Sequence, residues 1–81
     1  MYTRVKYIIT KDEQIIVFDE MFNHSDFSKF NPIRAGFISF GARDGNPSCS
    51  CYGESFTLNM KSDPERDTLI AKRRLNMLDD Y

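Results

Sequence analysis

The chain has 81 residues, of which 41% are hydrophobic and 28% are charged, and its formal net charge is −1. This length and composition predict one folded domain over residues 1–81, and they exclude both a second domain and a disordered chain. The near-neutral charge argues against nucleic-acid binding, and no apolar run approaches the roughly 18 residues that a membrane-spanning helix requires.

The first predicted element is a β-hairpin from Val5 to Phe18. The runs VKYIIT and QIIVF are rich in β-branched and aromatic residues, and residues 11–13 form a polar connection between them. The pattern weakens over residues 19–31, where Asn23 and Ser25 are candidate N-caps for a short helix or a loop.

A further strand is predicted in IRAGFISF, directly after Pro32. Within it, Gly36 indicates either a bulge or a close approach of another backbone. Asp44-Gly45 and Asn46-Pro47 then mark a chain reversal.

The next strand is predicted in SCSCY, and Gly53 is expected to break or bulge it. SFTLNM is then expected to continue the sheet, because its apolar residues alternate with polar ones at the period of a strand. The apolar positions of this alternation are Phe56, Leu58 and Met60.

The C-terminal segment carries clear signals for a helix start. Either Ser62 and Glu65 form a capping box, or Asp63 is the N-cap with Pro64 at the first helical position. One face of this helix is apolar, with positions that include the late residue Leu78.

Two residues of this helix break its amphipathic pattern: Arg74 projects into the apolar face, and Leu69 projects from the polar one. Arg74 lies on the same side as Asp67, so it either packs its stem and pairs locally, or it points at a ligand or partner.

Together these elements predict an α+β fold. We expect a small antiparallel sheet of four to five strands, with the C-terminal helix packed on one face and a short helix between the second and third strands.

Cys49, Cys51 and His24 are the residues that could carry metal or thiol chemistry. A structural zinc site requires four ligands, and these three residues supply too few. Thiol catalysis would have to use His24, the only histidine, and no oxyanion-hole loop is recognisable. We therefore predict no metal, no cofactor and no catalytic residue. The cysteines are expected to be reduced thiols, which indicates a cytoplasmic location.

The order of AGFISF, CYGES, FTLNM and SDPERDTLIAK along the chain resembles small uncharacterised proteins of phage and bacterial mobile-element type. The resemblance covers most of the chain. It implies an accessory or host-interacting role, and it brings no assigned activity or catalytic residue.

These observations favour a non-enzymatic binding protein that acts on another protein or associates with itself as a homo-oligomer. An oligomer that holds an anionic or nucleotide-like small molecule between an arginine and aromatic rings is the alternative. A thiol-dependent enzyme using Cys49 or Cys51 is a third possibility. The candidate binding residues are Arg74, Arg34, Tyr52, Phe40 and Leu69.

Overall fold

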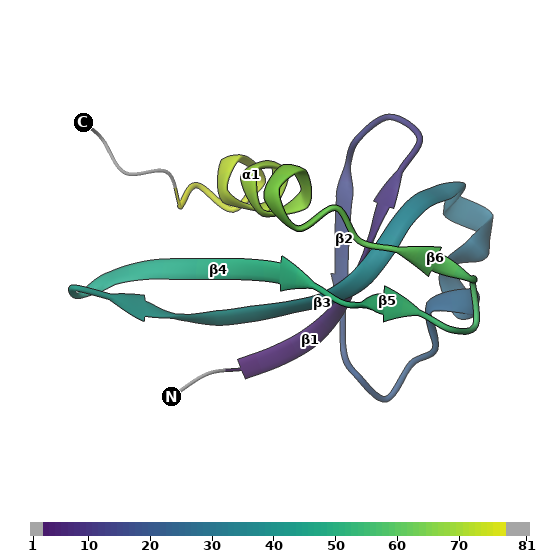
Figure 1. The fold of residues 1–81 in the computed structure, drawn as a ribbon, viewed down its shortest axis with the longest axis horizontal. Helices are drawn as coiled ribbons and strands as arrows, with labels where there is room; N and C mark the ends of the chain where they lie inside the picture. The colour runs from purple at the N-terminus through teal and green to yellow at the C-terminus, as the bar shows by residue number, and fades with distance from the viewer. Residues whose placement is uncertain (1–2, 78–81) are drawn as a thin grey trace.

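The computed structural model describes residues 3–77, apart from the side chains of Thr3 and Arg43. Four antiparallel strands form the main sheet in the order β2-β1-β3-β4 (Figure 1). A 3₁₀ helix, η1, follows β2, and a helix, α1, is the last element. The bounds are β1 Thr3–Thr10, β2 Ile15–Phe18, η1 His24–Phe30, β3 Pro32–Arg43, β4 Asn46–Tyr52, β5 Glu54–Ser55, β6 Met60–Lys61 and α1 Pro64–Arg74. The predicted α+β fold is confirmed.

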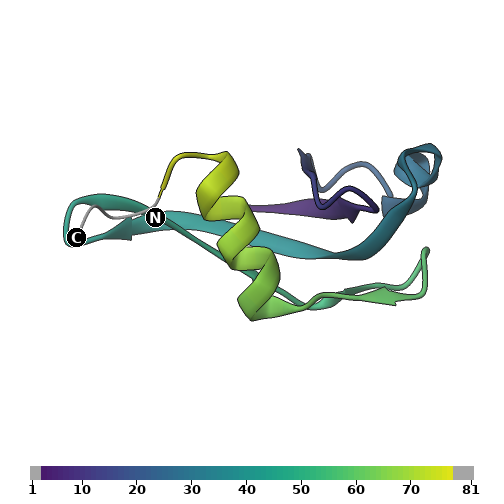
Figure 2. The same cartoon turned by 90° about the horizontal axis from the view of Figure 1, so that it is seen from above.

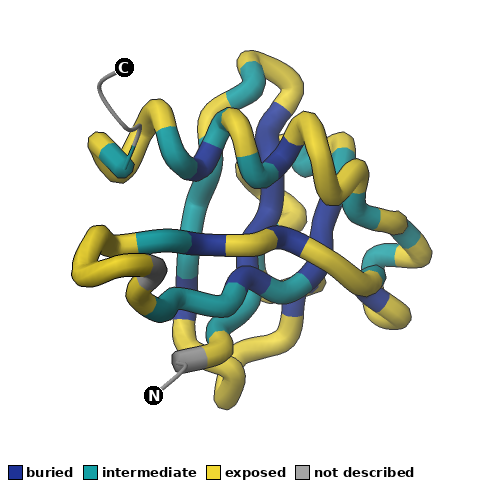
Figure 3. Tube along the Cα trace, turned by 60° about the vertical axis from the view of Figure 1, so that its left-hand side comes forward, coloured by how far each residue is buried: buried dark blue, intermediate teal, exposed yellow. Residues whose placement is uncertain are grey.

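The inner strand β1 is covered on both faces. On one face, Tyr7 and Ile9 pack with Ala71 of α1, which runs beside β4 in Figure 1. On the other face, Ile8 packs with Phe27 of η1 and with residues of the β5–β6 hairpin. Figure 3 shows the buried positions concentrated on the central strands, and Figure 2 shows the sheet from above with α1 crossing it. The sheet therefore separates two small hydrophobic clusters.

The prediction that SFTLNM continues the main sheet is wrong. Gly53 has a φ of +80° and ends β4, and β5 and β6 then form a separate two-stranded hairpin. Ser55 accepts a hydrogen bond from the backbone N–H of Leu58 at 3.2 Å, which closes the turn between these strands. Phe56 lies in this turn with 87% of its surface exposed. Alternating side chains fit a strand and a tight hairpin equally well, so the pattern did not distinguish them.

Two glycine predictions are confirmed. Gly36 allows a close backbone approach, because a Cβ atom at this position would lie 2.4 Å from the carbonyl oxygen of Tyr52. Asp44 and Gly45 form the reversal between β3 and β4, and both have positive φ, at 52° and 81°. Asn46 already begins β4.

Of the two predicted helix starts, the structure has the second. Asp63 is the N-cap, and its side chain accepts a hydrogen bond from the backbone N–H of Arg66 at 3.3 Å. Ser62 instead donates its hydroxyl to the carbonyl oxygen of Gly53 at 2.7 Å. The predicted face residue Leu78 lies outside the described residues. Within residues 3–77, no helix is long and apolar enough to cross a membrane.

Candidate functional site

The five residues predicted from the sequence as a binding site do not meet in one place. Arg34 and Phe40 are half-buried on the face of β3 that α1 covers. Tyr52 lies on the opposite face, where its ring stacks on that of Phe37 with centroids 6.1 Å apart. Leu69 and Arg74 are exposed on α1, with no ion pair for Arg74 among the described residues.

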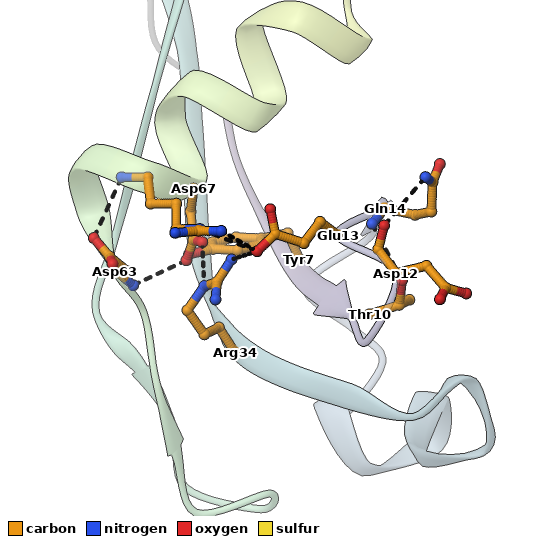
Figure 4. Close-up of polar contacts among 9 residues, drawn as sticks. Tyr7, Thr10, Asp12, Glu13, Gln14, Arg34, Asp63 and Asp67 are labelled. Atoms are coloured by element: carbon orange, nitrogen blue, oxygen red, sulfur yellow. Dashed lines mark hydrogen bonds and ion pairs between the residues drawn. The ribbon is translucent and has the colours of Figure 1, made fainter.

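Arg34 belongs to a buried polar cluster beneath the start of α1 (Figure 4). Its Nε donates to Oδ1 of Asp67 at 2.6 Å, and the Asp67 side chain is fully buried. Oδ2 of Asp67 accepts hydrogen bonds from the Tyr7 hydroxyl at 2.5 Å and from the backbone N–H of Asp63 at 2.9 Å. The carboxylate is thus satisfied by three donors from β1, β3 and the helix cap.

The outer side of this cluster is closed by Glu13, in the turn between β1 and β2. Glu13 accepts two hydrogen bonds from the guanidinium of Arg66 and lies 3.7 Å from Nη2 of Arg34. That Nη2 is buried and makes no hydrogen bond within the described chain. Because Arg34 is engaged with Asp67, the cluster holds α1 against the sheet and does not present Arg34 to a ligand.

The cysteines and the histidine lie on opposite faces of the sheet. Cys49 and Cys51 are buried and unpaired under α1, whereas His24 is buried in η1, where its Nε2 lies 2.8 Å from the carbonyl oxygen of Gly36. Burial raises the pKa of the Cys51 thiol to about 12 and also raises the pKa of Cys49. These thiols are therefore protonated near neutral pH and are poor nucleophiles. Residues 3–77 contain no group of three or more metal-ligating side chains.

A hollow of about 110 Å³ lies beside η1 on the face opposite α1. Its lining includes Lys6, Phe37 and Phe56, and Lys6 already donates to the carbonyl oxygen of Phe22 at 2.8 Å. Small-molecule sites usually enclose about 300–1,000 Å³, so this hollow can hold little more than one side chain.

The outer edge of β2 carries unsatisfied backbone groups. The backbone N–H of Thr10 donates to the carbonyl of Gln14 at 2.9 Å, and hydrogen-bonded pairs alternate along an antiparallel ladder. The backbone N–H and C=O groups of Ile16 therefore form hydrogen bonds with β1. The N–H and C=O groups of Ile15 and Val17 point away from β1, toward the open side of the sheet. No hydrogen bond from the described residues reaches these outward groups.

The opposite edge, β4, is partly covered by contrast. The backbone N–H of Cys51 points outward and donates to the hydroxyl of Thr68 in α1 at 2.9 Å. Pro47 lies at an equivalent outward position, where it offers no N–H. Sequence reasoning missed this difference between the two edges, because strand order is set by long-range pairing. The open edge of β2 is the candidate functional site.

No protein-family model, no curated protein and no solved structure matches this chain. Its function is therefore inferred from its own geometry.

Proposed function

We propose that this chain is a non-enzymatic protein-binding module that takes an extended segment of a partner protein as an added strand beside β2. The observation that carries the proposal is the pair of outward N–H and C=O groups at Ile15 and Val17, which have no partner among residues 3–77. In strand addition, main-chain hydrogen bonds supply affinity and the flanking side chains supply specificity.

The side chains around this edge support the same use. Ile15 and Val17 are half-buried on the α1 face, and Ile16 is half-buried on the η1 face. An added strand would cover apolar surface on both faces at once. Proteins usually protect exposed edges with proline, charges or bulges. β2, with the sequence IIVF, contains neither a proline nor a charged residue, whereas β4 carries Pro47.

The non-enzymatic part of the proposal rests on the buried thiols, whose raised pKa makes the thiol-enzyme alternative unfavourable. The small-molecule alternative has no comparable support, because Arg34 is engaged with Asp67 and lies far along β3 from Phe40. A cytoplasmic location, based on two unpaired cysteines, is part of the proposal, as is the accessory role that the sequence resemblance implies.

The test is a proline substitution at the edge. Val17→Pro removes one outward N–H and no hydrogen bond of the β1–β2 ladder, so an edge strand should tolerate it. Val17→Ala is the matched control, since it loses the side chain and keeps the N–H. Extended peptides would be selected from a displayed random library on the wild-type chain. Their binding to both variants would then be measured, with amide NMR to locate the contact.

We expect the selected peptides to bind the wild-type chain and Val17→Ala, to lose at least tenfold in affinity for Val17→Pro, and to shift the amides of Ile15 and Val17. Peptides that bind Val17→Pro as well as Val17→Ala, or that shift only amides elsewhere, would overturn the proposal. Circular dichroism of each variant separates loss of the edge from loss of the fold.

A further inference from the structure

Resting on the proposed function, we infer that the strand added beside β2 is an apolar segment with a basic residue at each end, and that it comes from a different protein. The inference follows from the charges that flank the edge. Asp12 and Glu13 precede β2, and Asp19 and Glu20 follow it.

Two of these four carboxylates are already neutralised within the chain. Glu13 pairs with Arg66, and Glu20 pairs with Arg4 at 2.7 Å. Asp12 has no ion pair among the described residues, and Figure 4 shows its side chain away from the cluster around Asp67.

Asp19 likewise has no ion pair among the described residues. Its Oδ1 accepts a hydrogen bond only from the backbone N–H of Met21, at 2.9 Å. Each end of the open edge therefore carries one exposed carboxylate that pairs with no cation of the described residues.

The spacing of these carboxylates sets the spacing of the partner's cations. A strand rises about 3.3 Å per residue, so a segment that covers β2 and reaches both flanks spans about 20–23 Å. Lysine or arginine residues six or seven positions apart would lie near Asp12 and Asp19. The apolar residues between them would cover Ile15, Ile16 and Val17.

A second copy of this chain fits the edge poorly. The two-fold antiparallel pairing that uses both outward positions places Ile15 opposite the second copy's Val17. The same register then places Glu13 opposite the second copy's Asp19, and Asp12 opposite its Glu20. Each free carboxylate, Asp12 or Asp19, then faces a carboxylate that is already paired with an arginine of its own chain, so self-pairing brings a cation to neither. A partner segment with basic ends supplies the two missing cations, and it therefore fits the edge better than a second copy.

The probes are two acetylated and amidated heptapeptides, KTVTVTK and ETVTVTE, which differ only in terminal charge. Binding would be measured by amide NMR titration of three proteins. They are the wild-type chain, a double variant that carries both Asp12→Asn and Asp19→Asn, and the control variant Asp44→Asn. Asparagine keeps the oxygen that Met21 uses, and it tolerates the positive φ of Asp44 in the distant β3–β4 turn.

We expect KTVTVTK to bind the wild-type chain about tenfold more tightly than ETVTVTE, in line with cross-strand charge pairs at both ends. That preference should nearly vanish in the double variant and persist in Asp44→Asn. It should also weaken in high salt, because the flanking carboxylates are exposed.

The outcomes separate the two proposals. If both peptides shift Ile15 and Val17 with equal affinity, the charge inference fails while strand addition at β2 stands. If KTVTVTK shifts only residues elsewhere, strand addition at β2 itself fails. Native mass spectrometry that gives a dimer, with Ile15 and Val17 protected in it, would show a second copy as the occupant and overturn the inference.

Discussion

The Tyr7 hydroxyl donates a 2.5 Å hydrogen bond to the Asp67 carboxylate, although the two residues are 60 positions apart. This contact joins the first strand to α1, and Arg34 joins the third strand to the same carboxylate. A buried charge that loses its partner costs far more than the net gain from forming the pair. The cluster therefore adds to the packing of Ala71 in holding the helix against the sheet.

Asp67→Asn should be strongly destabilising. The amide keeps the size of the carboxylate but loses its charge, so the half-buried Arg34 guanidinium is left without its closest counter-ion. We expect a loss of about 3–5 kcal/mol in the free energy of unfolding, measured by urea denaturation. Glu65→Gln, exposed on the same helix, is the control and should stay within about 0.5 kcal/mol of wild type. If the free energy of unfolding is similar for Asp67→Asn and Glu65→Gln, the cluster adds no stability.

Tyr7→Phe should be milder than Asp67→Asn. It removes only the hydroxyl, and the carboxylate keeps its hydrogen bonds from Arg34 and from the backbone of Asp63. We expect a loss of about 1–3 kcal/mol by the same urea measurement. A loss as large as that of Asp67→Asn would mean that the hydroxyl, and not the ion pair, dominates the cluster.

The parts of the fold that were predictable from the sequence are those with local causes. β-branched runs gave the β1–β2 hairpin, Asp44-Gly45 gave the next turn, and Asp63 followed by Pro64 gave the start of α1. Each of these signals acts within a few residues, so no knowledge of the distant chain is required.

The candidate site was not predictable in this way. Arg34 meets Asp67 across 33 positions, and its engagement there removes it from the set of free binding residues. Asp67 looked like an ordinary acidic residue near a helix start, because sequence alone does not show that it faces the sheet. Whether β2 is an inner or an edge strand depends on where β3 pairs; it adds to β1 and not to β2, and this choice is non-local.

Gly36→Ala should be destabilising. The new Cβ would lie 2.4 Å from the backbone oxygen of Tyr52, and this backbone cannot move without disturbing the β3–β4 pairing. Overpacking of this kind costs typically about 1–3 kcal/mol, which thermal and urea denaturation can measure. Gly45→Asn is the control, since its side chain meets open space and asparagine tolerates positive φ. If Gly36→Ala unfolds at the same temperature and urea concentration as the wild type, the two strands are farther apart in solution.

The chain should lose stability in mild acid because His24 is buried. Burial lowers the pKa of His24, and the charge of Lys6 adds to this effect, although the hydrogen bond to Gly36 opposes it. Below about pH 6.5 the unfolded state binds a proton that the folded state does not, so stability falls as the pH falls toward the lowered folded pKa. His24→Gln should lose less stability than wild type between about pH 7.5 and pH 5.5. Parallel urea midpoints for the two proteins across this range would contradict the prediction.

The two cysteines should react slowly with a thiol reagent in the folded protein. Burial raises the pKa of Cys51 to about 12, so near pH 8 its thiol is almost entirely protonated. Labelling should therefore be limited by opening of α1 from β4 and should become fast in urea. Ser50→Cys places a thiol at an exposed position between them on the same strand, and it should react at the rate of a free thiol. If Cys51 reacts as fast as this control, α1 does not cover β4 in solution, and thiol chemistry returns as a candidate function.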